Sequence, residues 1–153
     1  YKQSVVKIAL ARADGKPANP ATATVAVINF GKSARYNTRY QYDANTNTYQ
    51  RSIGGEASLD REEGQIAPSV VVALTVQQTT VQEDGIRENI ITTGQGKATI
   101  FQNGSVVEGI WRKANRASPL ELLDANGKAI ALTRGQTWIA AVPGGTGSVS
   151  WQQ

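Results

Sequence analysis

Carboxylates, lysines and tyrosines are the side chains that could do chemistry in this 153-residue chain, because it has no histidine and no cysteine. Their absence excludes Ser-His-Asp and Cys-His sites, disulfides and cysteine metal sites. A glycan hydrolase would need two carboxylates about 5–9.5 Å apart. The acids that could supply them are Asp43, Asp60, Glu62, Glu63, Asp84 and Asp124. The densest of these lie in glycine-punctuated loops, with nothing nearby to hold them or to raise a pKa. We therefore expect no catalytic residue, and a carboxylate-dependent glycan hydrolase remains an alternative.

Two further motifs bear on cofactor and metal binding. GQGKAT (94–99) contains a Gly-Lys pair, but a phosphate-binding loop also needs glycine where Ile91 stands and Ser or Thr where Ala98 stands. The dinucleotide-binding motif fails at Thr99, where it needs a third glycine. LDREEG (59–64) lacks the alternating ligand spacing of an EF-hand loop. We expect neither cofactor nor metal, and interpret the glycines of GQGKAT as the beginning or a bulge of a strand.

The stretch most suggestive of binding is RYNTRYQYDANTNTYQR (35–51). On a strand, one face would carry Tyr36, Thr38, Tyr40 and Tyr42, and the other Arg35, Asn37, Arg39 and Gln41. We predict that the tyrosines form a wall of the core, with their hydroxyls at its edge. A carbohydrate or peptide surface, or an OB-like nucleic-acid binder that stacks bases on the rings, remain alternatives. The candidate binding surface is Arg35, Arg39, Tyr40, Tyr42, Tyr49 and Arg51, and its three arginines are expected to matter more for binding than the acidic loops.

Short apolar runs bounded by Gly, Pro, Asn or Asp indicate β-strands. They lie at 4–11, 21–30, 36–43, 48–52, 69–76, 87–92, 98–102, 105–112, 120–123, 129–133 and 137–142. No window longer than about 11 residues keeps a helical stripe free of breakers. At most one or two short helical turns are expected, and Ser58–Glu63 makes at most one. The sequence therefore predicts an all-β, mainly antiparallel domain.

Turn residues indicate how these strands are connected. Asn103-Gly104 favours a type I′ hairpin turn, and DANG (124–127) and DANTN (43–47) favour two more. We expect a C-terminal antiparallel meander from about residue 87 to 143, and the earlier strands either close it into a barrel or pack on it as a sandwich. Trp111 and Trp138 are expected in the core, whereas Trp151 lies either in a final strand or in a tail.

The length of the chain is usual for one domain, and no apolar run approaches the roughly 20 residues that span a bilayer. The net charge of +4 is unevenly distributed. Residues 1–52 carry eight basic and two acidic side chains (+6), residues 53–93 two and seven (−5), and residues 94–153 six and three (+3). We interpret the acidic stretch as solvated loop. Because the chain begins with Tyr1, any targeting signal is expected upstream.

Motif order and spacing resemble the C-terminal domain of the YerB-like family of bacterial lipoproteins, a family of unknown function. The resemblance extends from about Val25 to Pro143 and includes NTRYQYDANTNTYQR and IGGEASLDREEGQIAPSVVVAL. Its most specific parts are GxGKA (94–98), the Asn-Gly hairpin, EGxWxK (108–113), the DxNGK turn and GQTWI (135–139). One departure is Tyr40, where the related pattern has tryptophan.

The resemblance implies secretion and a tether to the outer face of the cytoplasmic membrane through a lipidated cysteine upstream. It also implies a preceding N-terminal domain, so that residues 1–20 would be a strand or linker from it and residues 21–153 the β-domain. The resemblance supplies no activity. We expect a non-catalytic binding module whose partners are the preceding domain and an envelope protein or cell-wall polymer, and not nucleic acid.

Overall fold

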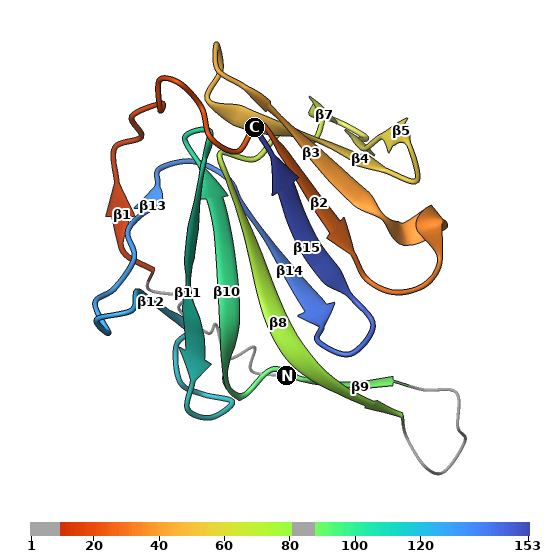
Figure 1. Ribbon diagram of the computed structural model, residues 1–153, viewed down its shortest axis with the longest axis vertical. Helices are drawn as coiled ribbons and strands as arrows, with labels where there is room; N and C mark the ends of the chain where they lie inside the picture. The colour runs from red at the N-terminus through yellow and green to blue at the C-terminus, as the bar shows by residue number, and fades with distance from the viewer. Residues whose placement is uncertain (1–9, 81–87) are drawn as a thin grey trace.

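The computed structural model describes residues 10–80 and 88–153 and contains two β-sheets packed face to face (Figure 1). The larger sheet has the strand order β12 (Glu121–Leu123), β11 (Ser105–Lys113), β10 (Gly94–Gln102), β8 (Val70–Thr80) and β14 (Thr137–Pro143), and β9 (Glu88–Ile91) also pairs with β8. The smaller has the order β15 (Ser148–Gln152), β2 (Val25–Asn29), β3 (Thr38–Asp43), β4 (Thr48–Ile53) and β5 (Glu56–Ala57). The prediction of an all-β fold is confirmed, as a sandwich rather than a barrel.

Two short strand pairs lie outside these sheets. β1 (Arg12–Ala13) pairs in parallel with β13 (Leu132–Thr133), and β6 (Leu59–Asp60) pairs with β7 (Gly64–Gln65) in an antiparallel hairpin. The first pair joins the segment before residue 20 to the rest of the fold. The second lies in the segment Ser58–Glu63, which the sequence limited to at most one helical turn, and no helical turn forms there. Asp60 instead accepts hydrogen bonds from the backbone N–H groups of Glu62 and Glu63, which favours a hairpin turn.

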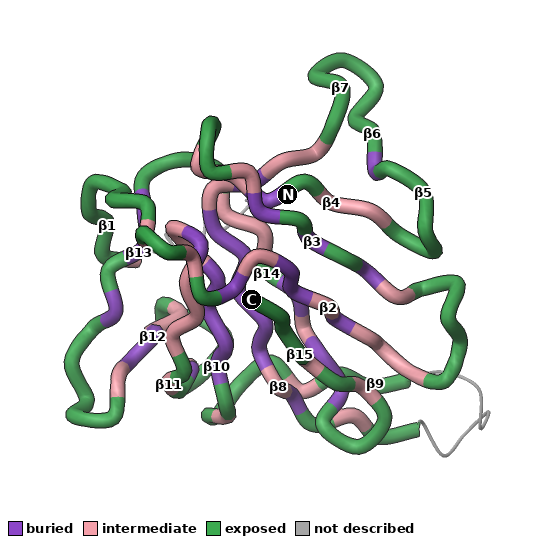
Figure 2. Tube along the Cα trace, turned by 45° about the horizontal axis from the view of Figure 1, so that its top comes forward, coloured by how far each residue is buried: buried purple, intermediate pink, exposed green. Residues whose placement is uncertain are grey.

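The strand patterns follow from which faces are buried. In β3, Thr38, Tyr40 and Tyr42 are buried while Arg39 and Gln41 are exposed, as expected of a strand with one face on the core. In β8 the run 70–74 is buried on both faces, which explains its continuous apolar sequence. Figure 2 shows buried stretches along β8, β10 and β14 of the larger sheet and along β2 and β3 of the smaller one.

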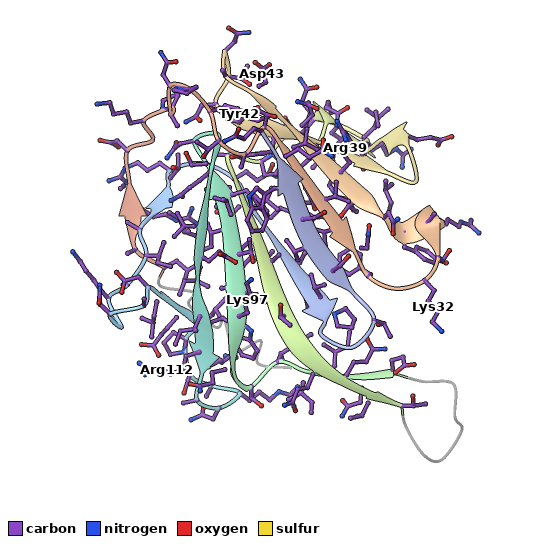
Figure 3. The ribbon with its side chains drawn as sticks, in the orientation of Figure 1. Lys32, Arg39, Tyr42, Asp43, Lys97 and Arg112 are labelled. Carbon is purple, nitrogen blue, oxygen red and sulfur yellow. The ribbon has the colours of Figure 1, made fainter. Side chains whose placement is uncertain are left out.

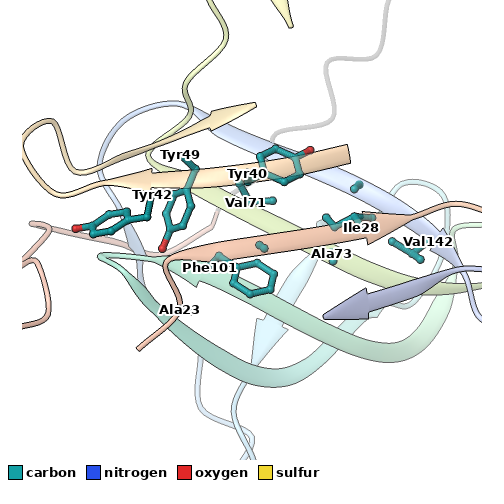
Figure 4. Packing of buried hydrophobic residues seen from close by; sticks show 11 residues of the cluster. Ala23, Ile28, Tyr40, Tyr42, Tyr49, Val71, Ala73, Phe101 and Val142 are labelled. Carbon is teal, nitrogen blue, oxygen red and sulfur yellow. The ribbon is translucent and has the colours of Figure 1, made fainter. Parts of the chain in front are cut away.

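One core fills the space between the sheets. Tyr40, Tyr42, Tyr49, Val71 and Phe101 meet there (Figure 4). A second apolar cluster covers the opposite face of the larger sheet, and its members include Val70, Val72, Leu74, Ile100, Trp111, Leu122 and Leu132. The larger sheet therefore forms the central layer of the domain.

The predicted hairpin turn at Asn103-Gly104 is confirmed, with φ of 56° and 69° at the two residues. The side chain of Asn103 accepts hydrogen bonds from Asn47 Nδ2 at 3.0 Å and from Thr133 Oγ1 at 3.2 Å. This turn therefore joins β10 and β11 and also connects them to two other parts of the chain. Trp151 lies in β15, and its ring packs edge-on against Phe101 with centroids 6.0 Å apart.

The expected C-terminal meander is correct only in part. β10, β11 and β12 form it, but β14 crosses to the other side of the sheet and runs parallel to β8. The strand expected at 129–133 forms only at its end. Ile130 packs in the second apolar cluster, and Leu132 and Thr133 form β13, which pairs with β1. Most of the expected strand at 4–11 lies outside the described residues. No helix in the described part of the chain is long and apolar enough to cross a membrane.

Candidate functional site

The predicted tyrosine wall lies in the core. Tyr40 and Tyr49 are fully buried and Tyr42 is 8% exposed. The rings of Tyr42 and Tyr49 lie 5.1 Å apart, and the Tyr42 hydroxyl donates to Asn47 Oδ1 at 2.9 Å. Burial raises the pKa of all three tyrosines above the ordinary value. Because the rings face inward, the alternative of an exposed stacking platform for nucleic-acid bases is wrong.

Tyr36 departs from the predicted alternation. It lies in a short 3-10 turn, η1 (Ala34–Tyr36), ahead of β3, and is 56% exposed. The strand begins only at Thr38, whose hydroxyl donates to the carbonyl of Ile28 at 3.1 Å. Tyr36 lines a surface hollow of about 520 Å³ together with Arg35 and Ile53.

Arg51 does not share a surface with Arg35 and Arg39, although the sequence predicts that it does. It pairs with Tyr40 in the β3–β4 ladder and faces the core side of the sheet. Its guanidinium lies 4.6 Å from the ring centroid of Trp138, and its Nη1 donates to Ser58 Oγ at 2.7 Å. Among the described residues, its Nε and the Tyr40 hydroxyl have no hydrogen-bond partner. Arg51 therefore contributes to the packing of the two sheets.

Arg35 and Arg39 remain at the surface. Arg39 projects from the outer face of the smaller sheet and donates to Gln41 Oε1 at 3.1 Å. In Figure 3 it lies with Lys32 on the side of the smaller sheet, away from Lys97 and Arg112. The candidate surface of three arginines and three tyrosines is thus reduced to two exposed arginines.

The loop carboxylates act within their own turns. Asp43 accepts from the backbone N–H of Asn45, and Asp124 accepts from those of Asn126 and Lys128, all at 2.9 Å. Two backbone N–H groups also lower the pKa of Asp60. Asp84 lies outside the described residues. Within residues 10–80 and 88–153, no group of three or more acidic side chains could hold a metal ion.

The most irregular part of the larger sheet lies where β10 leaves β8. The ladder between them ends at the pair Leu74–Ala98, and β8 pairs again, with β9, from Gln77–Ile91 onward. Between these two pairs, β8 has only Thr75 and Val76, whereas the opposite segment is 92–97. The segment 92–97 is therefore too long to pair with β8 residue by residue and forms a bulge. The sequence predicted that the glycines of GQGKAT mark the beginning or a bulge of a strand. Gly94 is the first residue of β10, and Gly94 and Gly96 lie where the pairing with β8 is interrupted.

Trp111 bridges this gap. It lies opposite Gly96 in the β10–β11 ladder, and its indole Nε1 donates to the Thr75 carbonyl oxygen at 2.8 Å. That bond takes the place of the backbone hydrogen bond that the Thr75 carbonyl would otherwise accept from β10. The indole reaches Thr75 only because residue 96 has no side chain, since a Cβ there would lie 2.5 Å from the Thr75 oxygen and 2.7 Å from Nε1. GxGKA and EGxWxK thus meet at one contact.

A cleft of about 690 Å³ with a mixed polar and apolar lining adjoins the bulge, and we name it the bulge cleft. One wall comes from β8, with Thr75, Gln77, Gln78 and Thr79, and the other from the segment around Gln95. Backbone is accessible at glycines 94, 96, 144 and 145. Its described lining carries amides, hydroxyls, peptide groups and the Lys97 ammonium beside the apolar side chains of Val76, Ile91 and Trp111, and no carboxylate. It therefore suits a ligand that both donates and accepts hydrogen bonds and also has some apolar surface.

An apolar pocket of about 280 Å³ adjoins the bulge cleft and shares Val76 and Trp111 with it. Its apolar lining comes from β8, β11, β14 and the loop before β12, with Leu74, Val76, Trp111, Leu120, Ile139 and Ala141. Lys113 and Arg116 also line it. Ile139 is 37% exposed beside the pocket. We name this site the Trp111 pocket.

The charges around the Trp111 pocket are of one sign. The Lys113 ammonium donates to the carbonyl oxygens of Arg116 and Ser118, and in the described structure neither Lys113 nor Arg116 has a carboxylate partner. The nearest acids along β11 and β12 are already paired. Lys97 binds Glu108 at 2.5 Å, and Arg112 binds Glu121 at 2.8 Å.

Sequence reasoning did not predict this pair of sites. The glycine bulge and a buried Trp111 were both expected, but separately. The signal that could have joined them is the register of the Asn103-Gly104 hairpin. Counting outward from that turn places Gly96 opposite Trp111.

Comparisons with known proteins agree on the family. Residues 26–139 match the family model described as "Protein of unknown function (DUF3048) C-terminal domain". The chain is 30% identical over 145 residues to "Putative lipoprotein YerB" of Bacillus subtilis (strain 168), covering 93% of this chain and 42% of the relative. The crystal structure of the YerB protein from Bacillus subtilis matches with a TM-score of 0.73 and 26% identity, over 92% of this chain and 46% of that one. The chain therefore spans less than half the length of these relatives.

Proposed function

The chain belongs to the DUF3048 C-terminal domain family, and we propose that it is a non-catalytic binding domain of a lipoprotein in the bacterial cell envelope. The relative from Bacillus subtilis is described as a lipoprotein, which supports this location. In this proposal a lipid anchor upstream holds the protein at the outer face of the cytoplasmic membrane. Residues 1–20 connect the domain, residues 21–153, to a preceding one.

The observation that carries the binding role is the Trp111 pocket with its cationic side. An apolar hollow of about 280 Å³ lies on the larger sheet beside the partly exposed Ile139, and the two cations that line it have no carboxylate partner among the described residues. Concave apolar sites with a few convergent polar groups are the usual form of binding sites. The partner is an envelope protein or an anionic cell-wall polymer.

A catalytic role has less support, because Asp43, Asp60 and Asp124 stabilise their own turns, and Glu108 and Glu121 are paired with Lys97 and Arg112. The inventory of side chains also lacks histidine and cysteine. The domain is therefore proposed to bind its partner without changing it.

The test is binding of the purified domain to cell-wall fragments and to detergent-solubilised envelope proteins, with and without Ile139→Glu. This substitution places a carboxylate in the pocket and should reduce retention by about tenfold. Leu59→Glu is the matched control, since Leu59 is 70% exposed in the β6–β7 hairpin, and it should bind as the unsubstituted domain does. Equal retention of both variants would contradict binding at the Trp111 pocket, and no retention of the unsubstituted domain on either material would contradict the binding role itself.

Arg35 and Arg39 mark the other proposed contact surface. If the partner binds there, Arg35→Glu with Arg39→Glu should reduce retention while Ile139→Glu should not. The same experiment thus locates the partner on one sheet face or the other.

A further inference from the structure

We propose that the ligand of the Trp111 pocket is an extended peptide segment of a partner protein, with a large apolar side chain next to an acidic residue. This inference rests on the proposed function and names its ligand class. Four features of the described residues carry it: the pocket, the cations beside it, the adjoining bulge cleft and the edge of β14.

The pocket provides a place for one apolar side chain. Leu74 and Val76 of β8 line the pocket, and so does Ile139 of β14. Leu74 and Val76 are nearly buried whereas Ile139 is 37% exposed, so an occupant would cover Ile139 most. Covering apolar surface of this kind is the main favourable term in association.

The charges select an acidic neighbour for that side chain. Lys113 and Arg116 line the pocket, and the acids closest in sequence on β11 and β12, Glu108 and Glu121, are bound to other cations. An acidic residue in the ligand would therefore meet two cations and no competing carboxylate in the described lining. Charge complementarity of this kind steers association and selects partners.

The bulge cleft favours a peptide over a lipid or a glycan. The amides, hydroxyls and peptide groups of the cleft can bind the N–H and C=O groups of an extended peptide. If a lipid placed one acyl chain in the Trp111 pocket and its other acyl chain in the cleft, the polar groups of the cleft would lose their hydrogen bonds. A sugar ring would need an exposed aromatic face to stack on. Trp111, the aromatic residue that lines both sites, is only 2% exposed.

The edge of β14 supports an extended conformation of the ligand. Gln136 accepts from Val70 N–H and Gly144 donates to the Val76 carbonyl, so even-numbered residues bond toward β8. Backbone groups of the alternate residues Ile139 and Ala141 therefore point away from β8. Within the described part of the chain, β14 has no strand partner on that side. Strand addition to a free edge is a common mode of peptide recognition.

The experiment selects phage-displayed random peptides on the purified 153-residue chain and measures the affinity of synthetic copies by fluorescence anisotropy. The selected peptides should share an apolar residue with Asp or Glu next to it. Lys113→Glu with Arg116→Glu should weaken their binding by about tenfold. Lys32→Glu with Lys128→Glu changes the net charge equally at exposed sites away from the pocket and should change affinity less than about twofold. Methylating backbone nitrogens of the peptide should also weaken binding.

Several results would overturn the inference. They are selected peptides without the apolar and acidic pair, equal losses in the two double variants, or no effect of backbone methylation. Pocket-dependent binding of phosphatidylglycerol vesicles without peptide binding would assign the pocket to lipid instead. Retention on wall fragments that Ile139→Glu abolishes, with no peptide selected, would leave the proposed function standing and refute only the ligand class.

Discussion

The indole nitrogen of Trp111 lies 2.8 Å from the carbonyl oxygen of Thr75 and donates a hydrogen bond to it across the backbone of Gly96. The Trp111 side chain thereby binds a carbonyl group of β8 just beyond the point where the ladder between β8 and β10 ends. This contact holds Trp111 in place, and Trp111 lines both the bulge cleft and the Trp111 pocket.

Gly96→Ala should destabilise the domain by about 2 kcal/mol, within the range for overpacking. The added methyl group would lie 2.5 Å from the Thr75 oxygen and 2.7 Å from Trp111 Nε1, so one of them must move. Urea unfolding monitored by tryptophan fluorescence measures the loss. Gly145→Ala in the same cleft is the control, since no atom lies within 4 Å of the place its methyl group would occupy, and its stability should change by less than about 0.5 kcal/mol. Equal effects of the two substitutions would refute the tight contact.

Tyr49→Phe should cost about 1–3 kcal/mol, the usual penalty for leaving a buried hydrogen-bonding group without its partner. The Tyr49 hydroxyl accepts from the backbone N–H of Gly104 at 3.0 Å, and both residues are buried. Thermal or urea unfolding is the measurement. Tyr36→Phe removes a hydroxyl from a side chain that is 56% exposed and should leave stability unchanged. A stable Tyr49→Phe variant would show that water or another acceptor satisfies Gly104.

Stability should fall as the pH rises above about 10, the ordinary pKa of tyrosine. Burial raises the pKa of Tyr40, Tyr42 and Tyr49 in the folded state, so the unfolded state loses these protons first and is favoured at alkaline pH. The stabilisation is complete below the unfolded value and is lost as the pH rises toward the folded one. Phenolate absorbance followed together with circular dichroism tests this. The three buried rings should ionise only with unfolding, and their ionisation in the folded domain would contradict the burial.

Arg51→Ala should destabilise the domain by about 1–2 kcal/mol, because it removes the contact with the Trp138 ring and the hydrogen bond to Ser58. Arg39→Ala is the matched control on the neighbouring strand and should change stability by less than about 0.5 kcal/mol. Chemical unfolding of the two variants is compared. If Arg39→Ala costs more, the assignment of Arg51 to the packing of the sheets is wrong.

Much of the local structure could be predicted because it depends on few neighbouring residues. Alternation in TRYQYD sends Tyr40 and Tyr42 to one face wherever the strand packs, and Asn103-Gly104 adopts positive φ whatever its partners are. The lack of histidine and cysteine excludes whole classes of chemistry before any folding is considered.

Tertiary structure alone decided the pairings between distant segments. Nothing within TWIAAVP specifies that β14 lies parallel to β8, since that choice depends on the burial of both strands between two apolar clusters. Arg51 faces inward because its strand pairs in register with Tyr40 and Trp138 lies across the core from it. The Trp111 pocket likewise has walls from separate segments of the chain. A sequence pattern reports which face of a strand is apolar, but side-chain packing between remote segments determines what that face meets.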